Sequence, residues 1–449
     1  MSENKKQSDE AIMLKIREDL LTPMTKFPLS YKIWIGSLLT IIAVAIWGYT
    51  IQLQNGLGET GMRDYVSWGV YIASFVFFVA TALVGMLISA VVGLVGQKWI
   101  TPISRIAEMI ALAFAMVAGI AIVADMGRPD RILNLLFHGR FQSPIIWDVT
   151  VVNLYIFISI LLLFLPLLPD LGIIRNHMKK DLPKWQWNMY NILSLGWVGT
   201  PGQYKILHST LRVLLILIVP VAMALHTVTS WLSALTLRAG WDSTIFGPYY
   251  VTGAFVAGAG AVLVAMYFIR KAYRLEDYIT DFHFDKMGKL MVLVGLVYLY
   301  FNINEFLVPG YKMKAADADH IFTLFSLNGE YGVMFWLTQT FGLLLPITLG
   351  LFKPFRKPFP MMLIGLAIVI GAWFKRVIII VPTMIHAYLP IQNVPESFHH
   401  YTPTGLEITV TLGIVAMAVL IISILVKLFP VISLWEIAEE KGVDIHKDL

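Results

Sequence analysis

The chain has 449 residues, of which 57% are hydrophobic and only 14% are charged, and its formal net charge is +5 at pH 7. Soluble globular domains carry about 25% charged residues, so this composition excludes an ordinary soluble protein and indicates an integral membrane protein. There is no cysteine, which excludes disulfides and cysteine-ligated iron–sulfur clusters within this polypeptide. The net charge requires no nucleic-acid partner, because the placement of Lys and Arg in the loops explains it.

Ten apolar spans follow one another along the chain. Each is about as long as the roughly 20 residues that cross a bilayer as a helix, and none alternates as the strands of a membrane barrel do. We therefore expect an all-α polytopic membrane protein, in which the first eight spans form two four-helix bundles and the last two are added. The expected spans are 32–52, 67–96, 102–126, 145–168, 207–236, 248–269, 288–305, 332–352, 358–382 and 405–428.

Lys and Arg are distributed unevenly over the connections between these spans. If the N-terminus is inside, 24 of the 34 Lys and Arg residues lie in inner segments and seven lie in outer ones. This bias is the one that the positive-inside rule predicts when both termini are cytoplasmic. We expect a cytoplasmic segment at 1–31, which lacks the features of a signal peptide, a transmembrane domain at 32–428 and a cytoplasmic tail at 429–449.

The turn between the third and fourth spans is rich in charge. Asp125 ends an outward-going span, Asp148 begins the next one, and Arg128 and Arg131 lie between them. Carboxylates at the mouths of lipid-embedded helices are costly and usually mark a functional site. His226 lies in the outer half of the fifth span, so these groups predict a site in the outer leaflet.

Other charged residues lie inside or beside the spans. On the inner side, Arg105 and Glu108 are three residues apart on one helix and are therefore able to pair, which either locks a helix pair or starts a proton path. On the outer side, the additional charged residues are Glu305, Lys375, Arg376 and Glu407.

Each of these groups also has a purely structural interpretation. Asp125 and Glu305 can be interfacial residues that reach water, and Asp148 can complement a helix dipole. Lys375 can extend outward to the interface, which is the favoured interpretation for this residue. His226 can be a hydrogen-bonded core histidine. The functional interpretation depends on the clustering of the groups.

A site with carboxylate, histidine, tyrosine and tryptophan side chains in the outer leaflet suits a quinone, which has an apolar tail and two polar oxygens. Quinol oxidation releases two protons and needs a nearby base, such as a carboxylate or a neutral histidine. Only His226 lies well inside a span, so a bis-histidine haem within this chain is not expected. The redox centre that takes the electrons should belong to a partner beside the outer loops.

The same residues belong to a series of motifs that extends over nearly the whole chain. The motifs are Ser67-Trp-Gly69, Arg105-x-x-Glu108, Asp125-Met-Gly-Arg-Pro-Asp-Arg131, Ser143-Pro-Ile-Ile-Trp-Asp148, His226-Thr-Val-Thr-Ser-Trp231, Trp241-Asp-Ser-Thr-x-x-Gly-Pro-Tyr-Tyr250, Trp373-x-x-Arg376 and Tyr401-x-Pro-Thr-x-x-Glu407. Together they resemble the NrfD/PsrC family of polysulfide-reductase-type membrane subunits. With ten spans, the chain resembles the longer branch of this family, which includes the sulfite-reductase-associated DsrP type and the membrane subunits of alternative complex III.

The resemblance implies a subunit of the prokaryotic cytoplasmic membrane that binds menaquinone or ubiquinone and exchanges electrons with a ferredoxin-like iron–sulfur subunit. It further implies a complex with cytochrome c or other catalytic redox subunits. Alternative-complex-III-type chains tend to have an acidic residue shortly after the His-Thr-Val motif. Trp231 and Leu232 stand there in this chain, which favours a complex of sulfur metabolism or another anaerobic respiration.

The resemblance also implies roles for individual residues. Asp125, Asp148 and His226 are the expected catalytic groups, which bind the quinone headgroup or accept its protons. No metal ligands are expected. The expected quinone-binding residues are Asp125, Arg128, Trp147, Asp148, Tyr155, His226 and Arg376, and the expected proton path consists of Arg105, Glu108, Glu305 and Glu407.

Two other functions stay open at this point. A secondary transporter would place polar groups near the midplane on broken helices, and Pro220 and Pro346 are the notable prolines inside the spans. A structural anchor for a redox partner would tolerate the loss of Asp125, Asp148 and His226.

Overall fold

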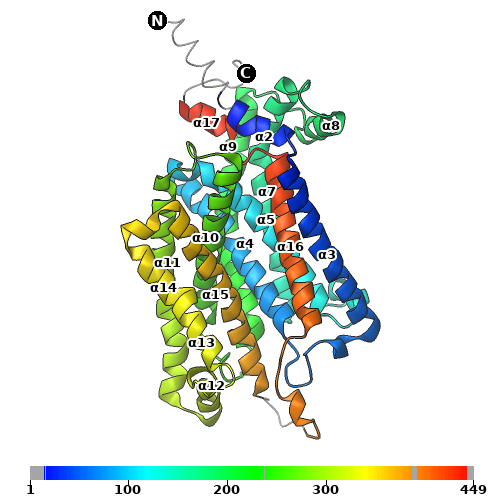
Figure 1. Cartoon of the computed structure of the whole chain (residues 1–449), viewed down its shortest axis with the longest axis vertical. Coiled ribbons are helices and arrows are strands. Elements are labelled where there is room, and N and C mark those ends of the chain that lie inside the picture. The colour runs from blue at the N-terminus through cyan, green and yellow to red at the C-terminus, as the bar shows by residue number, and fades with distance from the viewer. Residues whose placement is uncertain (1–14, 16, 237, 387–391, 442–449) are drawn as a thin grey trace, which may run out of the picture.

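The computed structural model describes residue 15 and residues 17–236, 238–386 and 392–441, and these parts are helical with connecting loops (Figure 1). Nine helical segments within them are long and apolar enough to cross a membrane, and Val70–Leu83 is a shorter apolar stretch. The prediction of an all-α polytopic protein with about ten spans is confirmed.

Ten long segments follow the order of the predicted spans. Several continue past the apolar residues: α11 begins seven residues before the expected start, at Asp281, because Thr280 and His283 form a capping box there. The segments are α3 (Leu29–Asn55), α4 (Val70–Val95), α5 (Thr101–Asp125), α7 (Pro144–His177), α9 (Pro201–Ala234), α10 (Phe246–Tyr273), α11 (Asp281–Lys312), α13 with η5 and α14 (Gly332–Leu351), α15 (Pro358–Ile385) and α16 (Gly405–Leu428).

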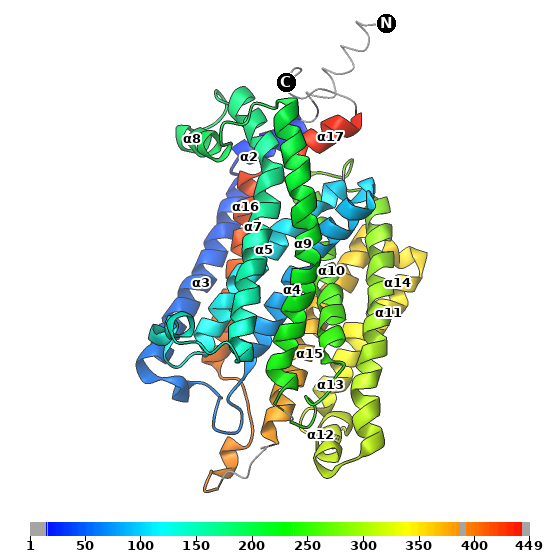
Figure 2. The same cartoon turned by 180° about the vertical axis from the view of Figure 1, so that it is seen from behind.

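Short helices mark the two ends of the molecule. α2 (Thr22–Thr25), α8 (Lys184–Leu193) and α17 (Leu434–Lys441) lie at one end, and α12 (Ala315–Phe325) lies at the other (Figures 1 and 2). We call these the α17 end and the α12 end. The α17 end carries the described parts of the two terminal segments predicted to be cytoplasmic; residues 1–14, 16 and 442–449 of those segments lie outside the described residues. The remaining short elements are η1 (Arg17–Leu21), η2 (Leu57–Glu59), η3 (Lys98–Ile100), η4 (Pro129–Arg131), α6 (Asn134–Phe137), η6 (Lys353–Arg356) and η7 (Glu396–Phe398).

The long helices form two four-helix bundles and one additional pair. The first bundle consists of α4, α5, α7 and α9, and the second consists of α10, α11, α13–α14 and α15. The additional pair is α3 with α16, which packs on α5. The predicted number of bundles is therefore right, but the added helices are the first and the last rather than the last two. Small residues allow this pairing, since a Cβ on Gly413 would lie only 2.0 Å from the Cβ of Ala45.

The two bundles contact each other through α4, α5 and α9 of the first and α10 and α15 of the second. The indole of Trp373 on α15 donates to the hydroxyl of Ser74 on α4 at 3.0 Å. The indole of Trp241, in the loop before α10, donates to the carbonyl oxygen of Ile379 on α15 at 2.6 Å. Helix α15 is thus fixed against the first bundle as well as within its own.

One span of the second bundle changes its helical pitch. Residues Thr340–Leu344 form a π-helical turn between α13 (Gly332–Gln339) and α14 (Leu345–Leu351), and Pro346 follows it at the start of α14. The turn touches α15 backbone to backbone, because a Cβ on Gly342 would lie 2.6 Å from the Cα of Gly371. Single π-helical turns inside α-helices are frequent at functional sites.

We expect Gly371→Ala to destabilise the fold. Its Cβ would lie 2.3 Å from the Cα of Gly342, where no real side-chain atom fits. Overpacking of this kind costs about 1–3 kcal/mol, so the melting temperature in detergent should fall. The matched control is Gly119→Ala on α5, where no heavy atom lies within 4 Å of the new Cβ. Equal melting temperatures for the two variants would contradict the close approach.

Candidate functional site

Asp148 lies one turn inside α7 and faces α9. Its side chain is buried, and its Oδ1 lies 2.5 Å from the hydroxyl oxygen of Thr229. The Thr229 hydroxyl also lies 2.8 Å from the carbonyl oxygen of Leu225, one turn earlier on α9. The facing helices α7 and α9 thus hold a carboxylate and a hydroxyl in direct contact.

The Thr229 hydroxyl has one hydrogen and two acceptors within reach. A threonine hydroxyl donates one hydrogen bond and accepts others. If its hydrogen goes to Leu225, the short contact with Asp148 is satisfied by a proton on the carboxyl group. If its hydrogen goes to Asp148, the carboxylate is satisfied without one. The geometry therefore accommodates Asp148 both with and without a proton, as a proton acceptor requires.

His226 lies three residues before Thr229, on the same face of α9. Its Nδ1 is 3.3 Å from the carbonyl oxygen of Ala222. A carbonyl only accepts, so Nδ1 carries the hydrogen and Nε2 presents its lone pair. The Nε2 atom is buried and has no hydrogen-bond partner among the described residues. His226 therefore offers a free acceptor beside the Asp148–Thr229 contact.

Asp125, the last residue of α5, lies in a different surrounding. Its charge interacts with Glu407 on α16 and with Tyr71 on α4. Tyr71 donates to Gln52 on α3 at 2.8 Å. Within the described parts of the chain, the Oδ1 atom of Asp125 is buried and has no hydrogen-bond partner. Asp125 thus faces α3, α4 and α16, whereas Asp148 and His226 lie between α7 and α9.

The other residues predicted to bind the quinone have structural contacts. The Tyr155 hydroxyl is buried and donates to the carbonyl oxygen of Ala82 at 2.7 Å, which joins α7 to α4. The Trp147 ring, which directly precedes Asp148 in the sequence, packs edge-on against the Trp231 ring, with 6.3 Å between the ring centroids. Arg128 forms an exposed ion pair with Asp130 at 2.9 Å. The Arg128 guanidinium lowers the pKa of the Asp130 carboxyl through this hydrogen bond.

Arg376 lies between the two bundles. Its guanidinium stacks over the ring of Tyr250 at 4.8 Å, and its charge interacts with His226. The Nη1 atom is buried and has no hydrogen-bond partner in the described ranges. Arg376 therefore adds a positive charge near His226 rather than a direct contact.

Arg105 has an ion-pair partner that differs from the expected one. The prediction paired it with Glu108, but its Nη1 lies 2.5 Å from Asp170 on α7, and both side chains are fully buried. Asp170 also accepts hydrogen bonds from the backbone N–H groups of Leu434 and Trp435. The sequence did not reveal this pair because Asp170 lies 65 residues away. The pair fastens the C-terminal segment to the first bundle.

Asp170→Asn is expected to loosen the C-terminal segment. The substitution leaves Arg105 buried without a counter-charge, which is strongly destabilising for a buried pair. Hydrogen exchange of the backbone amides in 430–437 should become at least about tenfold faster. Asp181→Asn, an exposed substitution at the same end, is the control and should leave the exchange unchanged. Unchanged exchange in Asp170→Asn would show that the pair does not hold this segment.

Lys375 and Glu305 are also more buried than the sequence analysis expects for interfacial residues. Lys375 was expected to extend towards the interface, but its side chain is only 6% exposed and its Nζ lies 3.4 Å from Glu305. The interpretation of Lys375 as an interfacial side chain is wrong. Glu305 is only 8% exposed and does not reach water as an interfacial residue would.

Glu407 caps α16 and ties loops together at the α12 end. Its carboxylate accepts from the backbone N–H of Gly61 at 2.7 Å and from the Tyr401 hydroxyl at 2.7 Å. Thr404 completes a capping box. Burial and the charge of Glu407 raise the pKa of Tyr401 far above its usual range, so Tyr401 stays a donor. A place for Glu407 on a proton path remains a prediction.

Comparisons with known proteins give the family. The family model for "Polysulphide reductase, NrfD" matches residues 58–387, which is most of the chain. The chain belongs to the NrfD family. The match begins after α3 and ends before α16, so it covers both four-helix bundles and leaves out the additional helix pair. The resemblance seen in the motifs is confirmed.

Three relatives match along almost their full length. A "Putative dimethyl sulfoxide reductase membrane subunit" of Halobacterium salinarum is 29% identical over 87% of this chain and 89% of its own. A "Selenate reductase subunit" of Mesobacillus selenatarsenatis is 25% identical over 90% and 95%. An "Hdr-like menaquinol oxidoreductase integral membrane subunit" of Archaeoglobus fulgidus is 24% identical over 90% and 96%. This similarity covers a larger share of the chain than the family model does. The family membership and the apolar helices together show that this NrfD protein is a multi-pass integral membrane protein.

Proposed function

We propose that this NrfD protein is the quinone-binding membrane subunit of a multisubunit respiratory oxidoreductase. It exchanges electrons between the quinone pool and a ferredoxin-like iron–sulfur partner at the α12 end. The observation that carries the proposal is the group of Asp148, Thr229 and His226 between α7 and α9. The named relatives support it, since all three are subunits of reductase or oxidoreductase systems and one is a menaquinol oxidoreductase subunit.

Quinol oxidation needs one acceptor for each hydroxyl proton and a path for two electrons. The free Nε2 of His226 accepts a hydrogen bond from one quinol hydroxyl and then its proton. Asp148 accepts the second proton, because Thr229 satisfies the carboxyl group in either protonation state. Arg376 opposes the accumulation of positive charge on His226, which favours onward release of the proton. Asp125 accepts protons at a separate position near α16.

The loop between α5 and α7 is the surface proposed for the partner. Its apolar side chains project outward: Phe137 is 76% exposed and Phe141 is 83% exposed. Arg131 and Arg140 are exposed in the same loop. Large apolar side chains next to arginines are typical of protein interfaces. The loop directly precedes Asp148, so a partner docked there brings its redox centre close to the quinone site.

The orientation of the protein in the membrane follows from its charge distribution. The α17 end carries the Lys- and Arg-rich segments and faces the cytoplasm under the positive-inside rule. The α12 end, with Asp148 and the 126–143 loop, then faces the outside. Electrons pass to or from the partner on that side.

The test of this proposal is quinone binding by the intact complex. A photoreactive quinone analogue should label peptides of α7 and α9, and excess natural quinone should suppress the labelling. His226→Leu removes the free acceptor and should weaken analogue binding by about tenfold. His208→Leu, an exposed position on the same helix towards the α17 end, is the control. Labelling that is confined to other helices would refute the assignment of the site.

A further inference from the structure

A second buried polar cluster lies in the second bundle, apart from the proposed quinone site. Lys375 and Glu305 form its ion pair, with a distance of 3.4 Å between Nζ and Oε2. The side-chain amides of Asn302 and Gln339 bond each other at 3.0 Å, and the Tyr249 hydroxyl donates to Asn302 at 3.0 Å. Charged groups buried within membrane spans are costly and usually have a function.

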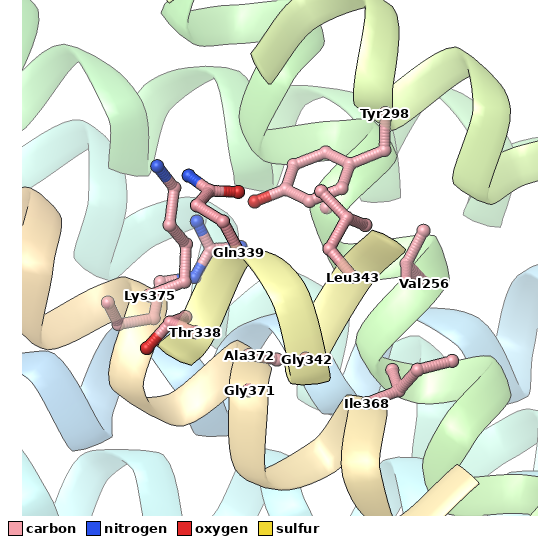
Figure 3. Close-up of a pocket in the computed structure, with 12 residues that line it drawn as sticks. Val256, Tyr298, Thr338, Gln339, Gly342, Leu343, Ile368, Gly371, Ala372 and Lys375 are labelled. Carbon is pink, nitrogen blue, oxygen red and sulfur yellow. The ribbon is translucent and has the colours of Figure 1, made fainter. Parts of the chain in front are cut away.

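A small cavity adjoins this cluster. Its volume is about 20 Å³, which is enough for one water molecule and far too small for a quinone ring. Figure 3 shows the side chains of Lys375, Gln339 and Tyr298 directed towards one another at its edge. The π-helical turn forms part of its wall through Gly342 and Leu343. Apart from their contact with each other, the Lys375 Nζ and Glu305 Oε2 atoms have no polar partner in the described residues, so each can also bind water.

The cluster is coupled electrostatically to the proposed quinone site. Arg376 lines the cavity and its charge acts on Lys375. The same guanidinium acts on His226 on the other side. A proton that arrives at His226 therefore raises the positive potential at Arg376 and Lys375 together. This favours loss of a proton from Lys375.

Two histidines lie at the α12 end, where α12 packs on α15, the helix that carries Lys375. His320 on α12 is 6% exposed, and its ring packs against Gly240, where a Cβ would lie 2.6 Å from Nε2. Its Nδ1 atom is buried without a hydrogen-bond partner in the described part of the chain. The ring of His386 lies 6.1 Å from that of His320 between centroids. His386 is half-buried, and its Nε2 is 3.3 Å from the Thr323 hydroxyl.

The buried histidine has a positive charge near it, whereas the histidine closer to the surface has negative charges near it. Lys375 acts on His320, and the exposed carboxylates Asp319 and Glu330 act on His386. Burial lowers the pKa of His320 to about 3, with smaller contributions from His386 and Lys375. The His320 ring is therefore neutral at physiological pH, with one nitrogen that donates and one that accepts. A proton relay requires both functions on one ring.

We propose that His320 and His386 form a proton route between the buried Lys375–Glu305 pair and the aqueous phase at the α12 end. The Lys375 ammonium gives a proton through a water molecule to one nitrogen of His320, whose other nitrogen releases a proton to His386. His386 releases it to water beside Asp319 and Glu330. The pair then has a net charge of −1 until uptake from the opposite face restores the ammonium.

This inference rests on the proposed function, because quinol turnover at His226 supplies the driving charge. The test measures protons released at the α12 side per quinol oxidised, with the intact complex in proteoliposomes, a soluble quinol analogue and a pH-indicator dye. Quinol oxidation alone supplies two protons. We expect more than two from the wild type and a fall to two in His320→Phe, with the rate of electron transfer retained.

Two further variants test whether the titrating rings of the histidines are required. His320→Asn preserves polarity without a titrating ring, and His386→Gln changes a half-buried side chain; both should also release two protons. His208→Gln, which changes an exposed histidine on α9 towards the α17 end, should behave like the wild type. Wild-type release of only two protons, or unchanged release in all three route variants, overturns the proton route. Failure of the wild type to oxidise quinol would instead overturn the proposed function.

Discussion

Asp148→Asn is expected to lower the quinol turnover of the complex by about 100-fold or more, which is the range that a positioned acid–base group contributes. The asparagine amide still fits beside Thr229 and still accepts its hydrogen bond, but it cannot take up a proton. The protein should therefore fold and assemble normally. Turnover is measured with a quinol analogue and an artificial electron acceptor, at equal amounts of assembled complex.

Two comparisons separate this effect from a general loss of charge. Asp130→Asn removes a carboxylate that is exposed and paired with Arg128, and it should leave turnover nearly unchanged. Asp125→Asn changes the group beside α16, and it should also lower turnover if protons are accepted there. Normal turnover in Asp148→Asn would remove this residue from the site.

Glu305→Gln is expected to destabilise the protein by about 3–5 kcal/mol, because it leaves the buried Lys375 ammonium without its counter-charge. Both side chains are almost fully buried, so bulk water cannot solvate the ammonium group in place of the carboxylate. The measurement is the melting temperature of the purified protein in detergent, which should fall clearly below that of the wild type.

A double substitution tests the cause of this loss. Glu305→Leu with Lys375→Met removes both charges, so it should be more stable than Glu305→Gln alone. Lys289→Met breaks an exposed ion pair with Asp285 and should change the melting temperature little. A Glu305→Gln variant as stable as the wild type would show that Lys375 is not held as a buried cation.

The spans and their order could be predicted from the sequence. Apolar length alone identifies a membrane helix, and the charge bias of the loops orients it. The assignment of helices to bundles could not be predicted, because α3 and α16 lack a marked polar face that would indicate a neighbour. Their pairing depends on a close fit of small residues, such as Gly413 on Ala45, which hydropathy does not record.

The candidate site could be predicted only in part. Asp148 and His226 were selected as candidates from their cost in the membrane, and the structure adds Thr229, which contacts Asp148 and lies three residues after His226 on α9. The partner of Lys375 could not be predicted, because Glu305 lies on another helix and single-sequence reasoning gives no distances between helices. His320, which belongs to the proposed proton route, was not selected from the sequence because it lies in a short helix outside the predicted spans.

The central claim is that this chain binds quinone and passes electrons to a partner that holds the redox centre. The most direct test is to purify the complex gently, record its visible spectrum, add quinol and then extract the bound quinone. We expect bound quinone in the extract and reduction of an iron–sulfur or haem signal that disappears when this chain is isolated alone. A native preparation with neither quinone nor a redox partner would contradict the claim.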